Sequence, residues 1–313
     1  MKQGVLLVTN KADVTMSIVD PEKGSELASI PVGGTTAHEV VASPDGQFAW
    51  LPIYGDSGVG MPGTDGRTVN VIDLDSRKMV TSIDLGAPSR PHCAVFGPGN
   101  GMLYVTSELT NSIKVIDPVE LKVIDSVPTG EPESHMMVIT KDGKRAYTSN
   151  VGAGTVSAID IEQKKVIKII PISRVAQRIS ISIDDRWVFT ADQTKPDLVV
   201  IDSSSNSIKT RIPLDGYAYG TAPTRDGHYL IVAQPSSHSV SIVDLNSFKV
   251  VKSIKVPREP QEVLVRTDNR IAYVSCDESK QVAAIDLSSW KVEKIINVGA
   301  GADGLAWASA RNF

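Results

Sequence analysis

The sequence has almost no cysteine and no long apolar segment. Its 313 residues include two cysteines, Cys93 and Cys276, which lie far apart in the chain. A scaffold held by disulfides is therefore excluded, and a reducing compartment is permitted. No apolar run reaches the length of about 18 residues that a membrane-spanning helix needs. Neither disulfides nor a bilayer are expected to define this fold.

The chain also lacks a block of positive charge. Its formal net charge is −4, its isoelectric point is about 5.8, and its Lys and Arg residues are scattered singly. A nucleic acid or an anionic membrane surface is therefore not an expected partner. A small-molecule substrate or ligand remains, and the sequence does not indicate an oligomeric state.

No targeting segment is visible in the sequence as given. The segment Met1 to Gly4 is too short and too polar for a signal peptide, and a strand-like run follows it directly. We expect a cytoplasmic protein. The alternative is a periplasmic or secreted protein from which a leader has been removed.

The common local signatures of catalysis are missing as well. The sequence contains no GxxxxGK, HExxH, GxSxG or CxxC motif and no paired-carboxylate motif. The segments SPDGQ, TKDGK and TRDGH, which begin at Ser43, Thr140 and Thr224, are typical of tight hairpin turns. Function has to be sought in residues that the fold brings together.

What the sequence does contain is a repeat. The segment from Pro91 to Gly130 predicts four short strands, CAVF, MLYVTS, SIKVID and LKVIDSV, which are separated by GPGNG, ELTN and PVE. An aspartate ends the third strand of each copy, and the spacings between successive copies are 53, 44, 43, 42, 42 and 42 residues. These aspartates are Asp20, Asp73, Asp117, Asp160, Asp202, Asp244 and Asp286.

The start of the first strand provides a second, independent register with the same period. Its members, which we call the axial ring, are His38, His92, His135, Gln177, Tyr219, Gln261 and Asp303. A four-stranded unit of this length cannot bury both of its faces alone, so the copies must pack around a common axis. The sequence therefore predicts an all-β protein, a β-propeller of seven four-stranded antiparallel blades.

The repeats resemble a known family. Runs such as Tyr104–Ser107, Tyr147–Asn150 and Leu7–Asn10, each followed by a VxVID-like strand, are similar to the YVTN family of β-propeller repeats. Similar repeats occur in lactonase-type propellers and in propellers that bind haem d1 in nitrite reductases and their relatives. The resemblance implies the fold much more strongly than any activity.

The register also predicts how the ring closes. We expect residues 1–313 to form one domain, with a last blade built from 303–313 and 1–34, because the first copy lacks a first strand. The first complete blade carries about ten extra residues within 54–67. This insertion should hang over the face on which the axial ring lies, either as a functional flap or as a passive loop.

The axial ring holds the candidate metal site. His38, His92, His135 and Asp303 come from four adjacent blades, and imidazoles with a carboxylate suit a divalent transition metal such as Zn, Fe, Mn, Ni or Cu. The alternative is that these histidines only form hydrogen bonds to carbonyl groups or water at the mouth of the channel.

Residues next to the ring are candidates for contact with a substrate. The candidate catalytic residues are Glu39, Arg178, Tyr219 and Glu262, and the candidate substrate-binding residues are Tyr54, Arg67, Arg90, Glu133, Gln177, Tyr217 and Gln261. They suit a metal-dependent enzyme that acts on a small polar substrate, by hydrolysis as the resemblance to lactonases implies, or by redox chemistry. A propeller that binds a ligand, a tetrapyrrole or a protein without chemistry is the alternative.

Overall fold

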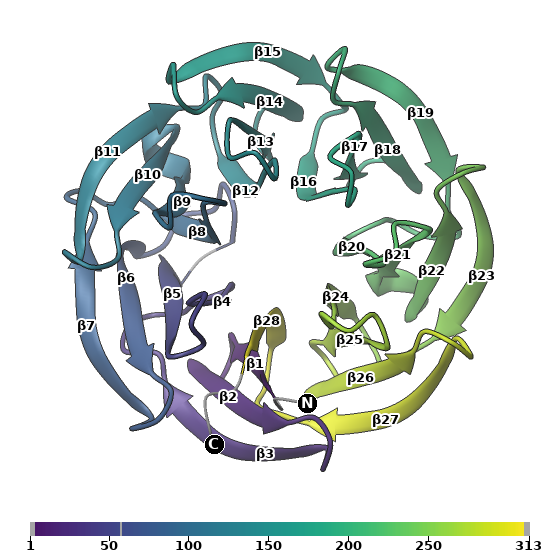
Figure 1. The fold of residues 1–313 in the computed structure, drawn as a ribbon, viewed down its shortest axis with the longest axis horizontal. Helices are drawn as coiled ribbons and strands as arrows, with labels where there is room; N and C mark the ends of the chain where they lie inside the picture. The colour runs from purple at the N-terminus through teal and green to yellow at the C-terminus, as the bar shows by residue number, and fades with distance from the viewer. Residues whose placement is uncertain (1–3, 57, 310–313) are drawn as a thin grey trace.

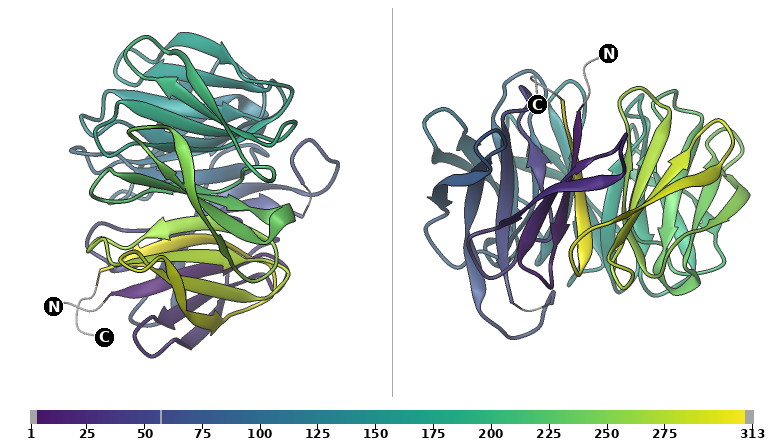
Figure 2. Two further views of the ribbon diagram at one scale, coloured as in Figure 1. Left: turned by 90° about the vertical axis from the view of Figure 1, so that its right-hand side faces the viewer. Right: turned by 90° about the horizontal axis from the view of Figure 1, so that it is seen from below.

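The structure is a computed structural model that describes residues 4–56 and 58–309. Seven sheets, each of four antiparallel strands, stand around a central axis (Figure 1), and the side views of Figure 2 show the ring of blades edge-on. The described residues contain no α-helix and two short 3-10 helices, η1 (Glu108–Thr110) and η2 (Pro235–Ser237). The predicted seven-bladed propeller is confirmed.

Within each blade the strands run in order from the axis to the rim. Blade 1 holds β4 (Val41–Ala42), β5 (Phe48–Gly55), β6 (Asp65–Asp73) and β7 (Lys78–Asp84), and blade 2 holds β8 (Pro91–Phe96), β9 (Leu103–Ser107), β10 (Ser112–Asp117) and β11 (Lys122–Pro128). Blade 3 holds β12 (Ser134–Ile139), β13 (Arg145–Asn150), β14 (Thr155–Asp160) and β15 (Lys165–Pro171), and blade 4 holds β16 (Ala176–Ile181), β17 (Trp187–Asp192), β18 (Asp197–Asp202) and β19 (Ser207–Pro213).

Blade 5 holds β20 (Thr221–Pro223), β21 (Tyr229–Gln234), β22 (Ser239–Asp244) and β23 (Lys249–Lys255), and blade 6 holds β24 (Pro260–Val265), β25 (Ile271–Cys276), β26 (Gln281–Asp286) and β27 (Lys291–Asn297). Blade 7 holds β28 (Ala302–Ala308), β1 (Val5–Asn10), β2 (Thr15–Asp20) and β3 (Ser25–Pro31).

The core lies between the blades. Second strands such as β1 and β17 are buried along their whole length, because both of their faces pack against neighbouring blades. One apolar cluster, for example, joins Val69 of blade 1 to Leu103 of blade 2. The fourth strands form the rim, and β11 and β27 alternate between partly buried and exposed positions.

The last blade is closed by both ends of the chain. The strand β28 pairs antiparallel with β1, and Leu6 faces Trp307 in this register while Val8 faces Leu305. The predicted origin of this blade is confirmed. Pairing the two ends hides an edge strand that would otherwise leave its backbone groups unpaired.

The insertion in blade 1 lengthens two strands before it becomes a loop. Both β5 and β6 extend beyond their counterparts, to Gly55 and from Asp65, and the two residues face each other in the ladder. Gly66 has to be glycine here, because a Cβ atom at this position would lie 1.8 Å from the carbonyl oxygen of Ile53.

Two inner strands are much shorter than the other five. The strands β4 and β20 begin after His38 and Tyr219, so these two ring members precede their strands. Near them, backbone hydrogen bonds run between blades instead. The N–H of Gly304 donates to the carbonyl of His38 at 2.9 Å, and that of Gly220 donates to the carbonyl of Gln261 at 3.0 Å.

Cys93 and Cys276 are buried on different blades, and both are free thiols, as expected. In the described ranges, which omit 1–3, 57 and 310–313, no helix is long and apolar enough to cross a membrane.

Candidate functional site

The three histidines of the axial ring form one cluster. The ring centroids of His92 and His135 are 3.6 Å apart, and those of His38 and His92 are 5.2 Å apart. Tyr54, from the start of the insertion, packs against all three, with centroid separations between 4.8 and 6.4 Å. Adjacent blades thus bring together side chains that are more than forty residues apart in sequence.

Glu108 anchors this cluster. Its carboxylate accepts a hydrogen bond from Tyr54 Oη at 2.8 Å and contacts Nδ1 of His135 in a close, fully buried pair. A carboxylate partner on Nδ1 places the proton on that nitrogen and leaves Nε2 with a free lone pair. Glu108 is therefore a positioning residue for His135.

The other two imidazoles are neutral. Burial lowers the pKa of His92 well below its usual value, and the positive charges of Arg178 and Lys11 act in the same direction. Burial also lowers the pKa of His38 to about 3, against the opposing charge of Asp303. Nδ1 of His92 is buried and has no hydrogen-bond partner among the described residues. A neutral imidazole with an unused nitrogen is a ready ligand or hydrogen-bonding group.

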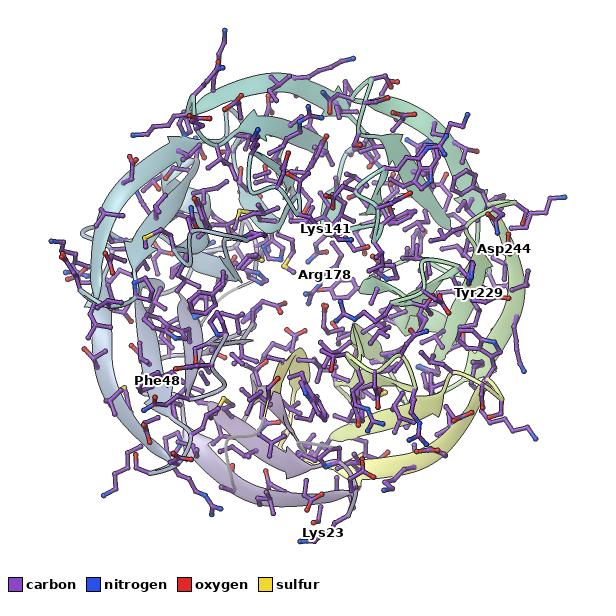
Figure 3. All side chains as sticks on the ribbon, viewed as in Figure 1. Lys23, Phe48, Lys141, Arg178, Tyr229 and Asp244 are labelled. Carbon is purple, nitrogen blue, oxygen red and sulfur yellow. The ribbon has the colours of Figure 1, made fainter. Side chains whose placement is uncertain are left out.

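A second cluster centres on Arg178, which Figure 3 places close to the axis of the ring. Its guanidinium donates to carboxylates from three other blades: to Glu39, to Glu262 Oε2 at 2.8 Å and to Asp303 Oδ1 at 2.9 Å. It also lies over the ring of Tyr219, with 4.7 Å from Cζ to the centroid. Arg178 is 2% exposed, so this network is buried near the axis.

Asp303 belongs to the Arg178 network more than to the histidines. Its Oδ2 forms an ion pair with Lys11 at 3.1 Å, and Lys11 also contacts Asp277 at 3.0 Å. Burial acts to raise the pKa of Asp303, but the charges of Lys11 and Arg178 outweigh it and lower the pKa. Nδ1 of His38 lies 3.9 Å from Asp303 Oδ2, beyond hydrogen-bond distance.

The two glutamates that share Arg178 differ from Asp303, because their pKa values are raised. Burial raises the pKa of Glu39 to about 8 and that of Glu262 to about 7, although Arg178 opposes both shifts. One guanidinium cannot neutralise three carboxylates, so the pair retains protons near neutral pH. These are the pKa values that suit proton transfer to or from a substrate.

Three of the predicted substrate-binding residues are bound to the protein itself. Arg90 donates to Asp65 Oδ1 and to the carbonyl of Met61, each at 2.6 Å, and thereby holds the insertion. Nε2 of Gln177 donates to Tyr219 Oη at 3.1 Å, and Nε2 of Gln261 donates weakly to a carbonyl of its own loop at 3.4 Å.

The remaining predicted contacts are spread more widely. Glu133 lies beside the insertion, since a Cβ atom on Gly60 would be 3.2 Å from its Oε1. Arg67 pairs with Asp84 on the surface of blade 1, with about half of its side chain exposed, and Tyr217 is 44% exposed on the loop before β20. The structure does not bring Arg67 or Tyr217 into contact with the axial ring.

Lys11, Glu108 and Asp277 contact the site but do not belong to the axial ring, so the register of that ring does not identify them. These residues share a register of their own, because each directly follows the second strand of its blade, after Asn10, Ser107 and Cys276. The shared position of these three residues after a second strand is the signal in the sequence that identifies them as a group.

The histidines have the donor chemistry for a metal but are not arranged around one point. Within 4–56 and 58–309, no three His, Cys, Asp or Glu side chains are placed to hold one ion. The residues nevertheless fit a metal in two respects, the unpartnered nitrogen of His92 and the tautomer that Glu108 imposes on His135.

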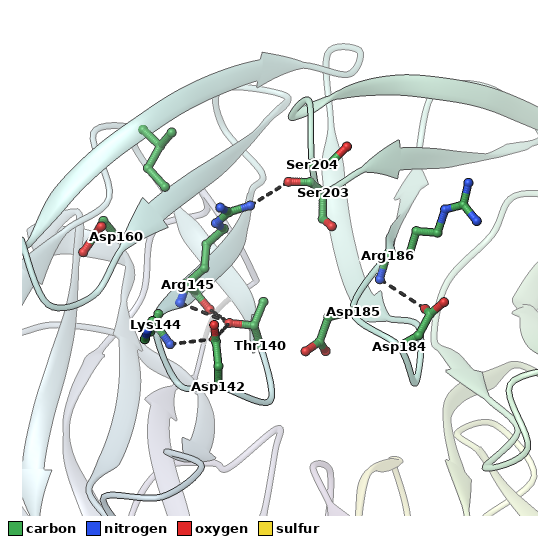
Figure 4. Close-up of a pocket in the computed structure, with 11 residues that line it drawn as sticks. Thr140, Asp142, Lys144, Arg145, Asp160, Asp184, Asp185, Arg186, Ser203 and Ser204 are labelled. Carbon is green, nitrogen blue, oxygen red and sulfur yellow. Dashed lines mark hydrogen bonds between the residues drawn. The ribbon is translucent and has the colours of Figure 1, made fainter.

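A cavity of about 510 Å³ lies elsewhere, between the turns of blades 3 and 4 on the opposite face (Figure 4). Its charged groups are largely engaged locally. Asp142 accepts from Thr140, for example, and Arg145 donates to the carbonyl of Ser203 at 2.6 Å. This cavity holds none of the perturbed groups described above, so the axial site is the stronger candidate.

Two family descriptions match the chain. One, "Lactonase, 7-bladed beta-propeller", matches residues 15–212, and the other, "YNCE-like beta-propeller", matches residues 182–311. A comparison with curated proteins finds no match.

Solved structures share the fold at low sequence identity. Hydrazine synthase of Kuenenia stuttgartiensis is 18% identical, with a TM-score of 0.76 over 91% of this chain and 92% of that chain. A protein of unknown function from Desulfotomaculum acetoxidans is 14% identical, with a TM-score of 0.80 over 98% and 99%. The dihydro-heme d1 dehydrogenase NirN, in complex with DHE, is 13% identical, with a TM-score of 0.70 over 97% and 75%.

Proposed function

Because the chain belongs to the lactonase, seven-bladed β-propeller family, we propose that it is a metal-dependent enzyme that hydrolyses a small polar, lactone-like substrate at the axial site. His38, His92 and His135 would hold a divalent transition metal ion, and their rings would have to turn toward a common point to do so. Asp303, which both Arg178 and Lys11 engage, is left out of this ligand set.

The observation that carries the proposal is the link from Glu108 through His135 to His92. A buried carboxylate that orients a histidine is the usual second layer of a metal site, and it is placed here beside an imidazole nitrogen that lacks a partner. The neutral state of His38 and His92 supports the same interpretation, since only neutral imidazole binds a metal.

A bound divalent ion would polarise the substrate carbonyl and lower the pKa of a coordinated water. The protein's own residues account for the remaining steps. Water adds to the acyl carbon, the ring C–O bond breaks, and the released alcohol oxygen takes up a proton. Glu262, with a pKa of about 7, is suited to remove the proton from water, and Glu39, with a pKa of about 8, is suited to supply one.

Metal content and activity test the proposal together. Wild type, His92→Ala and Gln261→Ala would be dialysed against a weak chelator and measured by elemental analysis and by hydrolysis of a set of lactones. We expect about one equivalent of metal in wild type and in Gln261→Ala, and less than about a tenth in His92→Ala. A wild type without metal, and without a thermal shift on addition of Zn, Mn, Fe, Ni or Cu, would contradict the metal site.

A binding protein without catalysis, or a redox protein, is the second candidate. The close stacking of His92 on His135 supports it, because a separation of 3.6 Å leaves no room for an ion between the two rings. The likeness to NirN in complex with DHE makes a tetrapyrrole the ligand to try first. A protein that hydrolyses no lactone but changes the absorption spectrum of an added tetrapyrrole would favour this candidate.

A further inference from the structure

The face that carries the axial ring is rich in acidic residues. We call it the His face. It is formed by the connections from second to third and from fourth to first strands. Their acidic residues are Asp13, Glu39, Asp56, Glu108, Glu131, Glu133, Asp215, Glu259, Asp277 and Glu278, and their basic residues are Lys11, Arg90, Arg174, Lys195, Arg258 and Lys280. Asp303 at the axis adds to the acidic set, and Arg178 adds to the basic one.

The cations that contact the axial site are all engaged by the protein. Arg178 is bound by three carboxylates, and Lys11 is bound by Asp277 and Asp303. Arg90 is bound by Asp65 and by carbonyl groups of the insertion. Each cation is thus neutralised in place, and among the residues that the structure describes none of these three is left to bind an anionic group.

From this arrangement we infer that the axial site takes a substrate without negative charge and discriminates against carboxylated or phosphorylated molecules. The inference rests on the proposed function for the position of the substrate. An anion that approaches His38 would cross the acidic connections of the His face, and none of Arg178, Lys11 and Arg90, among the described residues, is free to balance its charge. Clefts lined by one sign of charge concentrate ligands of the opposite sign and repel those of the same sign.

The negative charge of the His face would also assist turnover. Hydrolysis of a neutral lactone produces a hydroxy acid, which carries a negative charge at neutral pH. The product would therefore leave a site that had accepted its uncharged precursor. Arg90, a candidate substrate-binding residue, is engaged in holding the insertion and is not left free to bind the acid product.

Nitroxide probes of different charge measure the sign of the electrostatic field at His38, and this measurement does not require knowledge of the substrate. The imidazole signals of His38, assigned by their loss in His38→Gln, would be recorded with 4-amino-, 4-carbamoyl- and 4-carboxy-TEMPO at equal concentration and low salt. Since His38 is partly exposed, we expect the cationic probe to relax its signals at least about threefold more than the anionic one, and added salt to remove the difference. Equal relaxation, or stronger relaxation by the anion, would overturn the inference.

A pair of charge reversals locates the effect. Glu133→Lys changes the His face, and Glu120→Lys makes the same change in the turn between β10 and β11 on the opposite face. We expect Glu133→Lys to shrink the difference between the probes at His38 and Glu120→Lys to leave it unchanged. An equal response of the two variants would mean that net charge, and not the face, is what the probes detect, and the inference would fail.

The substrate preference is measured with an isosteric pair, 5-oxotetrahydrofuran-2-carboxamide and the corresponding carboxylate. We expect kcat/KM to be at least about tenfold higher for the carboxamide. Preference for the carboxylate would overturn the inference while leaving hydrolysis established. Absence of hydrolysis of both would contradict the proposed function, and the nitroxide result would still decide the sign of the field.

Discussion

Arg178 on blade 4 donates a hydrogen bond of 2.9 Å to Asp303 on blade 7, and the two residues are separated by 125 positions in the chain. This contact crosses the axis of the propeller and joins the middle of the chain to the strand that closes the ring. The axial network is therefore a structural element as well as part of the candidate site.

Replacement of Arg178 by Met should destabilise the protein strongly. The substitution leaves Glu39, Glu262 and Asp303 buried together without their shared cation, which costs about 3 to 5 kcal/mol in the free energy of unfolding. Denaturant unfolding of Arg178→Met and of Arg186→Met, whose guanidinium lies over Trp187 on the opposite face, measures the difference. Similar stability of the two variants would show that the network does not depend on Arg178.

Stability should decrease as pH rises from about 6.5 to 8.5. The pKa values of Glu39 and Glu262, about 8 and 7, lie above that of an unfolded glutamate, so the folded state holds protons that the unfolded state has lost. This contribution is complete below the unfolded value and disappears as pH passes through the folded values. His38 and His92 have lowered pKa values, so they change the free energy of unfolding only below about pH 6.5.

The measurement is the free energy of unfolding at several pH values in this window. Glu39→Gln and Glu262→Gln should each flatten the profile, because an amide does not titrate. Stability that is constant or increases across the window in wild type would contradict the raised pKa values.

Glu108→Gln should weaken metal binding by about 10- to 100-fold with little change in melting temperature. The amide can still accept one hydrogen bond but no longer fixes the Nδ1 proton of His135. Tyr54→Phe, which removes only the other hydrogen bond to Glu108, should have the smaller effect. Calorimetric titration with Zn or Mn compares the two variants, and the reverse order of effects would remove Glu108 from its positioning role.

Arg90→Lys should loosen the insertion without unfolding the ring. A lysine has one ammonium group and cannot reach Asp65 and the carbonyl of Met61 together, so the loop from Asp56 to Thr64 loses its anchor. We expect a several-fold change in KM for a lactone substrate and an unchanged far-ultraviolet spectrum. If shortening this loop to a Gly-Ser link also leaves kinetics unchanged, the insertion is a passive loop.

Deletion of 303–313 should open the ring. It removes most of β28, exposes the buried face of β1 and takes away Asp303, the partner of Arg178 and Lys11. A fall of more than about 10 °C in melting temperature is expected. A truncated protein that melts as wild type does would show that blade 7 does not need its inner strand.

The fold and the members of the axial ring follow from the amino-acid sequence alone. A repeat of about 42 residues with alternating apolar positions is a local signal, and it is repeated often enough that both the number of blades and the closure by the two ends follow from counting. His38, His92 and His135 could be placed together for the same reason, because equal positions in successive blades have equal distances from the axis.

Which charged side chains pair with one another became clear from the three-dimensional arrangement. The period fixes the height of Arg178 but not the direction of its long side chain, which reaches across the axis to Glu39 and Asp303. Glu108 and Lys11 lie on connections whose paths depend on their neighbours, so their contacts with His135 and Asp303 could not be read from spacing. Pairing between distant charges is set by side-chain reach and burial, and neither quantity is periodic in the sequence.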